Sequence, residues 1–433
     1  MRYMLLMFRT KNFSSFKNDV VLDLRKTSFR EHPNHVFNYK DFSLLKTVAI
    51  FGPNASGKSN LISALSTFED FIINQMFKKL EDKDFDSDLS LNKNISMEPF
   101  LLTNKVDNEI EFEIIFGNND YLYQYGYSVE KTKILTEWLF INNELVFERD
   151  KDNKNLVFGQ KYIGLLKMYD KVRDDRLYIS ILDYFAVEDE LRDIMDKFKE
   201  FFYSKFNIYF ELLLESSVKG KAMSLNFHEN LLQNEPFRQK VSEYIRKIDV
   251  GIKEIIIDEE IITSRRTGKE EKRLIIKAVH SIYDEVGNII GEEAFDLKYE
   301  SSGTIRFLSF IQEILRIIDN GGVFIVDEMS SRLHPLLTKF IVDIFQSKIN
   351  KKNAQLIFTT HDVTLMNKDQ FRRDEVVFVD KDDKGKSTVY SLADLGVRPD
   401  ATFNKDYFRG KFGAIPIVDY FLLSDSGEKK WQD

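Results

Sequence analysis

Short apolar runs organise this chain of 433 residues. Residues 47–51, 323–326 and 355–358 are almost continuously apolar, which is typical of strands buried on both faces of a sheet. Between residues 108 and 148, apolar and polar side chains alternate, which predicts antiparallel strands with one face in the core. Residues 178–248 have a mainly helical pattern without sustained heptads, which argues against a long coiled-coil arm. We therefore expect an α/β fold.

A glycine-bearing loop at residues 52–60 separates the first apolar run from a helical pattern at residues 61–65. A strand, such a loop and a helix form the context that a phosphate-binding loop requires. Gly52 and Gly57 let the backbone N–H groups face a β-phosphate, and Lys58 can reach the β- and γ-phosphates. The sequence therefore predicts a site for a nucleoside triphosphate, which we take to be ATP. The predicted nucleotide-binding residues are Gly52, Pro53, Asn54, Ala55, Ser56, Gly57, Lys58, Ser59 and Asn60.

Two adjacent carboxylates, Asp327 and Glu328, follow the apolar run at residues 323–326. Asp327 is expected to hold Mg²⁺ through water, together with the hydroxyl of Ser59. Glu328 is expected to polarise the attacking water as a general base. An Asp-Glu pair after a buried strand can also serve only as a cap for the next element. Because the loop at residues 52–60 is present, we favour the catalytic interpretation.

Three further segments narrow the predicted class. Ser301 and Gly303 begin a helical run, and this start directs free N–H groups and a hydroxyl outward, as contact with a γ-phosphate requires. The alternative for this segment is an ordinary N-cap. The polar turn at residues 330–335 is a candidate crossing point of a dimer interface. His361 lies just after the apolar run at residues 355–358, where a switch that senses the γ-phosphate is expected. The alternative is a surface residue or a helix cap, which is what a histidine at a strand end usually is.

Taken in this order, the motifs resemble the ATP-binding cassette (ABC) superfamily, in its SMC-like and OLD-like branch rather than its transporter branch. The resemblance implies Mg²⁺-dependent ATP hydrolysis by a homodimer or higher homo-oligomer, in which two heads sandwich two ATP molecules head to tail. It assigns Ser301 and Gly303 to the signature that contacts the opposite subunit's ATP, and His361 to the switch histidine. Ser302 interrupts the Ser-Gly-Gly sequence of transporters, and Gln75 lies too early on its helix for a glutamine loop.

The same resemblance implies a domain organisation. The expected fold is an ABC-type P-loop ATPase head, with a mixed sheet flanked by helices, an antiparallel β subdomain and a mainly helical insertion. Residues 1–150 are predicted to form the N-terminal half of the head, residues 151–255 the insertion, and residues 256–433 the C-terminal half. We expect the insertion to determine partner specificity, and an internally packed lid is the equal alternative.

Patterns at residues 7–16, 371–379 and 407–416 resemble the RloA-like abortive-infection ATPases, a group that includes the ATPase component of PARIS-type anti-phage systems. The resemblance implies that nucleotide-driven assembly senses a phage trigger and controls a companion effector or toxin from the same operon. Two other classes stay open. Hydrolysis stimulated by duplex DNA would favour a DNA-maintenance clamp of the SMC or RecF kind, and co-purification with membranes would favour a transporter cassette.

Composition limits the remaining possibilities. The chain has no cysteine, which excludes disulfides, zinc–thiolate sites and a thiol nucleophile. No apolar run approaches the roughly 18–20 residues that span a bilayer, and the apolar start at residues 1–7 is too short for a signal peptide. We therefore expect a cytoplasmic protein without membrane contact. The net charge of −8 argues against constitutive, non-specific binding of nucleic acid but leaves a local basic patch open.

Two charged segments suggest functional sites but have simpler interpretations. Residues 265–273 are rich in Arg and Lys, yet they lie between strand-like segments, which favours a charged hairpin turn over a phosphate-binding surface. The carboxylates at residues 380–383 are similar to those of a TOPRIM nuclease, which follows the ATPase in OLD proteins. Too little chain follows them for a nuclease domain, so we favour a turn before the next strand.

Overall fold

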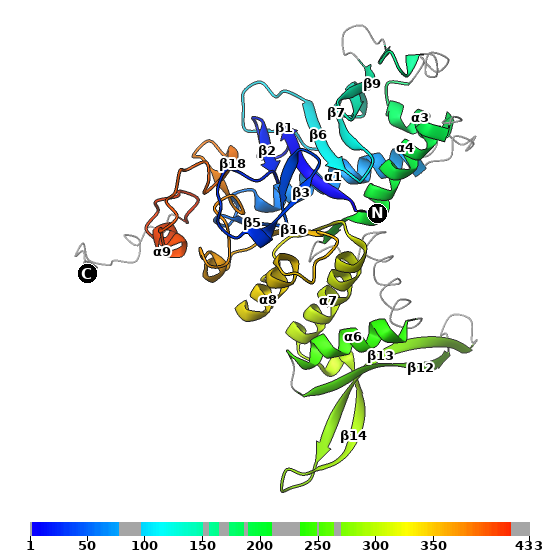
Figure 1. Ribbon diagram of the computed structural model, residues 1–433, viewed down its shortest axis with the longest axis vertical. Helices are drawn as coiled ribbons and strands as arrows, with labels where there is room; N and C mark the ends of the chain where they lie inside the picture. Colours follow the sequence, from blue (N-terminus) through cyan, green and yellow to red (C-terminus); the bar gives the residue numbers. More distant parts are fainter. Residues whose placement is uncertain are drawn as a thin grey trace, which may run out of the picture.

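The computed structural model describes residues 2–77, 97–149, 156–163, 173–185, 189–209, 234–248, 251–263 and 270–416. Within these residues, a six-stranded core sheet lies next to a seven-stranded antiparallel sheet, and a three-stranded sheet extends away from both (Figure 1). A separate hairpin is formed by β3 (Val36–Tyr39) and β4 (Phe42–Leu45). The predicted α/β class, with a mixed sheet and an antiparallel β subdomain, is confirmed.

The core sheet contains the three apolar runs of the sequence. Its strand order is β11-β15-β16-β5-β17-β18, and every neighbouring pair is parallel except β17 and β18. Because the carboxyl ends of parallel strands share one edge, the segments that follow β5, β15 and β16 meet there. The strands are β5 (Thr47–Phe51), β11 (Phe206–Tyr209), β15 (Val323–Val326), β16 (Gln355–Thr359), β17 (Val376–Lys381) and β18 (Ser387–Ser391).

The antiparallel sheet has the order β10-β9-β8-β7-β6-β1-β2. In β6, Ile110, Phe112 and Ile114 are buried while the intervening glutamates are partly exposed, as the alternation predicts. The strands are β1 (Met4–Lys11), β2 (Val20–Asp23), β6 (Glu109–Gly117), β7 (Leu122–Glu130), β8 (Lys133–Ile141), β9 (Glu144–Arg149) and β10 (Leu156–Phe158). This sheet brings the N-terminal strand against segments more than a hundred residues later.

Alternate side chains of the core strands enter two separate hydrophobic cores. On one face, Val48 and Ile50 pack in a core that includes α1 (Lys58–Phe77) and the antiparallel sheet. On the other face, Ala49 and Phe51 pack in a core that includes α7 (Ser302–Asn320) and α8 (Pro335–Gln346). Figure 1 shows α7 and α8 together on one side of the core sheet. Burial on both faces explains why these strands are apolar at successive positions.

Residues 151–255 supply helices and also one strand of the core sheet. The helical segment before β11 packs on the antiparallel sheet, where Phe201 stacks on Phe116 with ring centroids 4.0 Å apart. The chain then enters β11, which pairs in parallel with β15. This part of the predicted insertion is integral to the head, whereas the boundaries at 151 and 255 stay a prediction. The helices are α3 (Tyr178–Phe185), α4 (Asp189–Glu200), a π-helical turn (Phe201–Lys205) and α6 (Glu235–Arg246).

The three-stranded sheet precedes α7 in the chain. It consists of β12 (Ile252–Thr263), β13 (Glu270–Tyr283) and β14 (Ile289–Asp296), and α6 packs against β12. Figure 1 shows the β13–β14 hairpin pointing away from the core sheet. Thr263 pairs with Glu270, in agreement with the hairpin predicted around residues 265–273, although residues 264–269 lie outside the described ranges.

The carboxylates at residues 380–383 lie at the turn between β17 and β18. The Asp382 carboxylate accepts hydrogen bonds from the backbone N–H groups of Lys384 (3.0 Å) and Lys386 (2.7 Å). The predicted turn is therefore confirmed over the nuclease interpretation. The chain continues to α9 (Phe403–Phe408). Among the helices that the structure describes, none combines the length and apolar character needed to cross a membrane.

Candidate nucleotide-binding and hydrolysis site

The loop after β5 requires glycine at two positions. Gly57 has φ +112°, and a Cβ there would lie 2.6 Å from Ser387 Oγ and 2.8 Å from Ser15 Oγ. A Cβ on Gly52 would lie 2.3 Å from the carbonyl oxygen of Val379. Both contacts are much shorter than van der Waals distance, so the loop closes tightly only because these residues lack side chains.

Lys58 begins α1 and is the cation of this loop. Its Nζ donates to the carbonyl oxygens of Gly52 and Pro53, each at 2.9 Å, and the side chain is almost completely buried. Burial lowers the pKa of Lys58 to about 8, while the negative charges of Asp327 and Glu328 oppose that shift. The ammonium group is thus held in a partly desolvated position, where bound phosphates would favour its charged form.

Hydroxyl groups from both ends of the chain surround the phosphate-binding loop. Ser387 Oγ donates to the Ser56 carbonyl oxygen (2.6 Å) and lies at hydrogen-bond distance from Ser15 Oγ (2.8 Å). Asn60 Nδ2 also donates to Ser15 Oγ (2.8 Å), and the Ser387 N–H donates to the Ser15 carbonyl oxygen (2.8 Å). The sequence pattern gave neither Ser15 nor Ser387 a role at this site, because neither belongs to a motif of known chemistry.

Asp327 and Glu328 come directly after β15, at the edge where the loop also lies. Thr359, the last residue of β16, contacts both: its Oγ1 donates to Asp327 Oδ1 (2.6 Å) and accepts from the Glu328 N–H (2.7 Å). Glu328 has φ +51°, which is unusual for a residue with a side chain. Thr359 is a third residue that the sequence pattern did not single out.

His361 joins this group from the segment after β16. Its Nε2 lies 3.9 Å from Glu328 Oε1, and the two side chains are 41% and 46% exposed, so both are accessible from solvent. Desolvation and the charge of Lys58 lower the pKa of His361, and the two carboxylates oppose this. Lys58, Asp327, Glu328 and His361 therefore lie within one electrostatic neighbourhood, although the sequence separates the first from the last by about three hundred residues.

The predicted signature lies at the start of α7. Ser301 is the N-cap of this helix, and its Oγ accepts a hydrogen bond from the Thr304 N–H (3.0 Å). Gly303 packs closely on the chain after the carboxylates, because a Cβ there would lie 3.1 Å from the Arg332 carbonyl oxygen. The structure thus bears out the N-cap role of Ser301. Contact of Ser301 and Gly303 with a nucleotide stays a prediction.

The same helix directly contacts the turn that follows β15. Arg306 Nη2 donates to the Glu328 carbonyl oxygen (3.0 Å) and holds the backbone of the turn after β15. Gln75, in contrast, lies near the end of α1 and donates to the Asp175 carbonyl oxygen (3.2 Å). That contact is consistent with the prediction that Gln75 does not serve in a glutamine loop.

The residues present fit a triphosphate and a magnesium ion. The loop supplies a glycine-lined cradle and a buried ammonium group, and the neighbouring Ser59 side chain is exposed. Across the described residues, no cluster of three or more His, Cys, Asp or Glu side chains could hold a metal by itself. Ser59 and Asp327 would therefore share Mg²⁺ with phosphate oxygens and water, which is the usual manner of Mg²⁺ binding in such sites.

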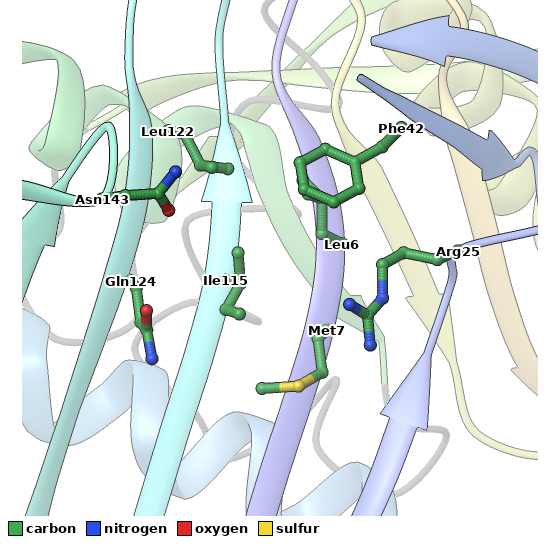
Figure 2. Close-up of a pocket in the computed structure, with 8 residues that line it drawn as sticks. All are labelled: Leu6, Met7, Arg25, Phe42, Ile115, Leu122, Gln124 and Asn143. Atoms are coloured by element: carbon green, nitrogen blue, oxygen red, sulfur yellow. The ribbon is translucent and has the colours of Figure 1, made fainter. Parts of the chain in front are cut away.

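A separate cavity of about 200 Å³ lies beside strands β1, β6 and β7 (Figure 2). Leu6 and Leu122, which line it, belong to a small core with the β3–β4 hairpin, and this core is distinct from the one that contains α1. Arg25 is paired with Asp23, and Gln124 Nε2 donates to Glu113 (2.7 Å). Because Arg25 and Gln124 are already engaged, we assign no ligand to this cavity.

The fold and the site define a class of protein. A parallel β-strand, a glycine-bearing loop that leads into a helix, and two carboxylates that follow β15, two strands away in the same sheet, give this protein the fold of an α/β P-loop ATPase of the ABC type. Residues 48–367 match the family described as "AAA domain, putative AbiEii toxin, Type IV TA system". The match covers well over half of the chain, and the protein belongs to this family.

Individual relatives are distant. An uncharacterised protein of Methanocaldococcus jannaschii, MJECL43, is 30% identical over 95 residues, which are 21% of this chain and 24% of that protein. The alignment thus spans about a quarter of that relative.

Solved structures were also compared. The SMC head domain from Thermotoga maritima has a TM-score of 0.43 at 14% identity and covers 90% of this chain and 99% of that chain. An SMC head domain with an extended coiled coil, bound to the C-terminal domain of ScpA derived from Pyrococcus furiosus, has a TM-score of 0.39 at 15% identity, covering 94% and 99%. Because these scores are below 0.5, the assignment of the fold rests on the strand order and the family.

Proposed function

We propose that this protein is a Mg²⁺-dependent ATPase that hydrolyses ATP between two copies of its head. The observation that carries the proposal is the convergence of Lys58, Asp327, Glu328 and His361 at one edge of the core sheet. These groups provide charge for the phosphates, a ligand for the metal and a base for the water. The family also supports an ATPase, since its description names an AAA domain.

Each residue of the site has a proposed part in the reaction. Lys58 leaves the carbonyl oxygens of the loop and binds the β- and γ-phosphates, while the backbone N–H groups of the loop hold the β-phosphate. Ser59 and Asp327 orient the metal, which supplies neutralisation of the charge that develops on the phosphates. Glu328 accepts the proton of the attacking water, and His361 responds to the presence of the γ-phosphate.

The second half of the proposal concerns assembly and biological role. The exposed start of α7, with Ser301 and Gly303, is proposed to complete the site of a second copy. Nucleotide binding would then assemble the heads in the cytoplasm, in response to a phage, and control a companion effector or toxin. Support comes from the family description, which refers to a putative toxin of a toxin–antitoxin system.

A change of Lys58 tests the ATPase. Lys58→Ala removes the ammonium group that contacts the phosphates, and its removal is expected to weaken ATP binding by about 10- to 100-fold. Binding of a fluorescent ATP analogue and release of phosphate are the measurements. Lys298→Ala is the matched control, because that side chain is 64% exposed on the segment before α7. Equal binding by the wild type and the Lys58→Ala variant would contradict the proposal.

A plaque assay tests the defence role separately. Cells that carry the protein and the product of the adjacent open reading frame should resist phage, and the Lys58→Ala variant should remove this resistance. Full protection by this protein alone would contradict control of a companion effector. A DNA-repair defect without a phage phenotype, together with hydrolysis stimulated by duplex DNA, would favour the DNA-maintenance clamp instead.

A further inference from the structure

We propose that Thr359 is a positioning residue whose single hydroxyl orients both carboxylates of the ATPase site. This inference rests on the proposed function and extends it to a residue outside the phosphate-binding loop and the carboxylate pair. Thr359 is completely buried at the end of β16, and its hydroxyl bonds to both Asp327 and Glu328.

The pairing of two strands places the hydroxyl. β15 and β16 are adjacent and parallel, and Val326 is paired with Phe358. The next residues, Asp327 and Thr359, therefore lie side by side at the carboxyl ends of the two strands. The register of a parallel pair is fixed along its whole length, so the hydroxyl lies beside the carboxylates in the folded protein without any contribution from a ligand.

The hydroxyl uses both of its hydrogen-bonding functions. Thr359 Oγ1 donates its proton to Asp327 Oδ1 at 2.6 Å, a short bond of the kind made to a charged acceptor. A carboxylate held through one oxygen cannot rotate freely, so Oδ2 of Asp327 keeps a defined direction. We infer that this fixed oxygen is the one that holds the water ligand of the metal.

The accepting side of the hydroxyl fixes Glu328. The Glu328 N–H donates to Thr359 Oγ1 at 2.7 Å, and the Glu328 carbonyl oxygen accepts from Arg306 at 3.0 Å. These bonds hold both polar groups of a residue with φ +51°, a conformation that is unfavourable for a residue with a Cβ. The turn directs the Glu328 carboxylate toward His361. Without the hydroxyl, the base would lose its fixed direction.

A purely structural role is the alternative, and the chain offers a control for it. Thr338 of α8 is also completely buried, but its hydroxyl has no hydrogen-bond partner among the residues that the structure describes. Thr→Val replaces a hydroxyl by a methyl group of similar shape at either position. Thr338→Val therefore tests the replacement alone, and Thr359→Val tests the loss of the two bonds. Thr359→Ser keeps the hydroxyl and is the conservative variant.

The experiment measures the affinity of a fluorescent ATP analogue with and without Mg²⁺, alongside kcat and KM for ATP. In Thr359→Val, we expect kcat to fall at least about tenfold and the gain in affinity on adding Mg²⁺ to fall about fivefold. Affinity without Mg²⁺ should stay within about twofold, because the contacts of Lys58 do not involve Thr359. Thr359→Ser should recover most of the loss, and Thr338→Val should resemble the wild type.

Either of two results would overturn the proposal. One is that Thr359→Val keeps the wild-type kcat and Mg²⁺ response. The other is that Thr359→Ser is as impaired as Thr359→Val. If Thr359→Val does not fold, as judged by its thermal unfolding, the comparison of Thr359→Ser with Thr338→Val decides: an impaired serine variant rejects the role. A wild-type protein that binds no ATP would instead reject the proposed function itself, so the two failures are distinguishable.

Discussion

At the scale of single residues, Glu137 of β8 is a carboxyl group enclosed by the protein. Its oxygens accept hydrogen bonds from the Tyr178 N–H (2.6 Å) and the Ile179 N–H (3.0 Å) at the start of α3, and from the Tyr125 hydroxyl (3.0 Å). Burial raises the pKa of Glu137 to about 7, although these bonds and the charge of Arg149 oppose the rise. Glu137 thus links the antiparallel sheet to the helix that covers it.

The raised pKa of Glu137 predicts a dependence of stability on pH. Because the folded pKa of about 7 lies above the ordinary value of 4.5, the folded protein binds the proton more tightly than the unfolded chain. The resulting stabilisation is complete below about pH 4.5 and is lost as the pH rises to about 7. The pKa of Tyr125 and that of Tyr127 are raised far above this range, so these neighbours do not titrate in it.

Urea unfolding across this pH range measures the effect. The free energy of unfolding of the wild type, minus that of Glu137→Gln, should fall by about 1.4 kcal/mol per pH unit between roughly pH 5 and 7. The control is Glu148→Gln, since Glu148 is exposed on the adjacent strand. A difference that does not change with pH would show that Glu137 is ionised throughout the range.

At the scale of secondary-structure elements, three segments meet at the phosphate-binding loop. The turn between β1 and β2 contributes Ser15, α1 contributes Asn60, and β18 contributes Ser387. Ser15 and Ser387 are separated by 372 positions along the chain. The shape of the loop therefore depends on the N-terminal and C-terminal parts of the fold, as well as on its own glycines.

Removal of one hydroxyl tests this support. Ser387→Ala deletes the bonds to the Ser56 carbonyl oxygen and to Ser15, and we expect affinity for ATP to fall about 3- to 10-fold. Titration with a fluorescent ATP analogue measures the change. Thr388→Ala alters an exposed neighbour on the same strand and should leave affinity unchanged. A variant at Ser387 with wild-type affinity would mean that the glycines alone hold the loop.

At the scale of the whole molecule, the predicted assembly follows from the position of α7. The helix begins with exposed residues, Ser301 and Ser302, and is tied through Arg306 to the turn that carries Glu328. Suppose that a nucleotide bound to a second copy contacts the start of α7. It would then act, through this helix, on Glu328, the proposed base of the first copy. This arrangement predicts that hydrolysis depends on contact between copies.

Glu328→Gln tests the assembly. The change removes the base but leaves Lys58, Ser59 and Asp327, so hydrolysis should fall by about 10²- to 10⁴-fold while ATP stays bound. Light scattering should then detect a larger species in ATP and Mg²⁺, and wild-type turnover should rise faster than linearly with protein concentration. Glu285→Gln, in the turn of the β13–β14 hairpin, is the control. Turnover proportional to concentration down to low nanomolar levels would argue for an active single head.

The sequence by itself determined the local elements and the chemistry of the site. Residues 47–51 and 323–326 form the expected strands, because a strand buried on both faces must be apolar throughout. The loop at residues 52–60 was recognisable because only glycine fits where a Cβ would overlap other atoms. The positions of Asp327, Glu328 and His361 at one edge of the core sheet could be predicted for a similar reason, since each lies within two residues of the end of a recognisable strand.

Only the tertiary structure decided which distant residues support that chemistry. β11 is interrupted by Asn207 and so has no continuous apolar run, and it became part of the core sheet by pairing with β15. Thr359 reaches the Asp327 carboxylate and the Glu328 N–H because β15 and β16 are neighbours, a fact that no property of either segment alone expresses. Ser15 and Ser387 meet for the same reason. Local patterns record whether a side chain is buried, whereas strand order and register determine what lies beside it.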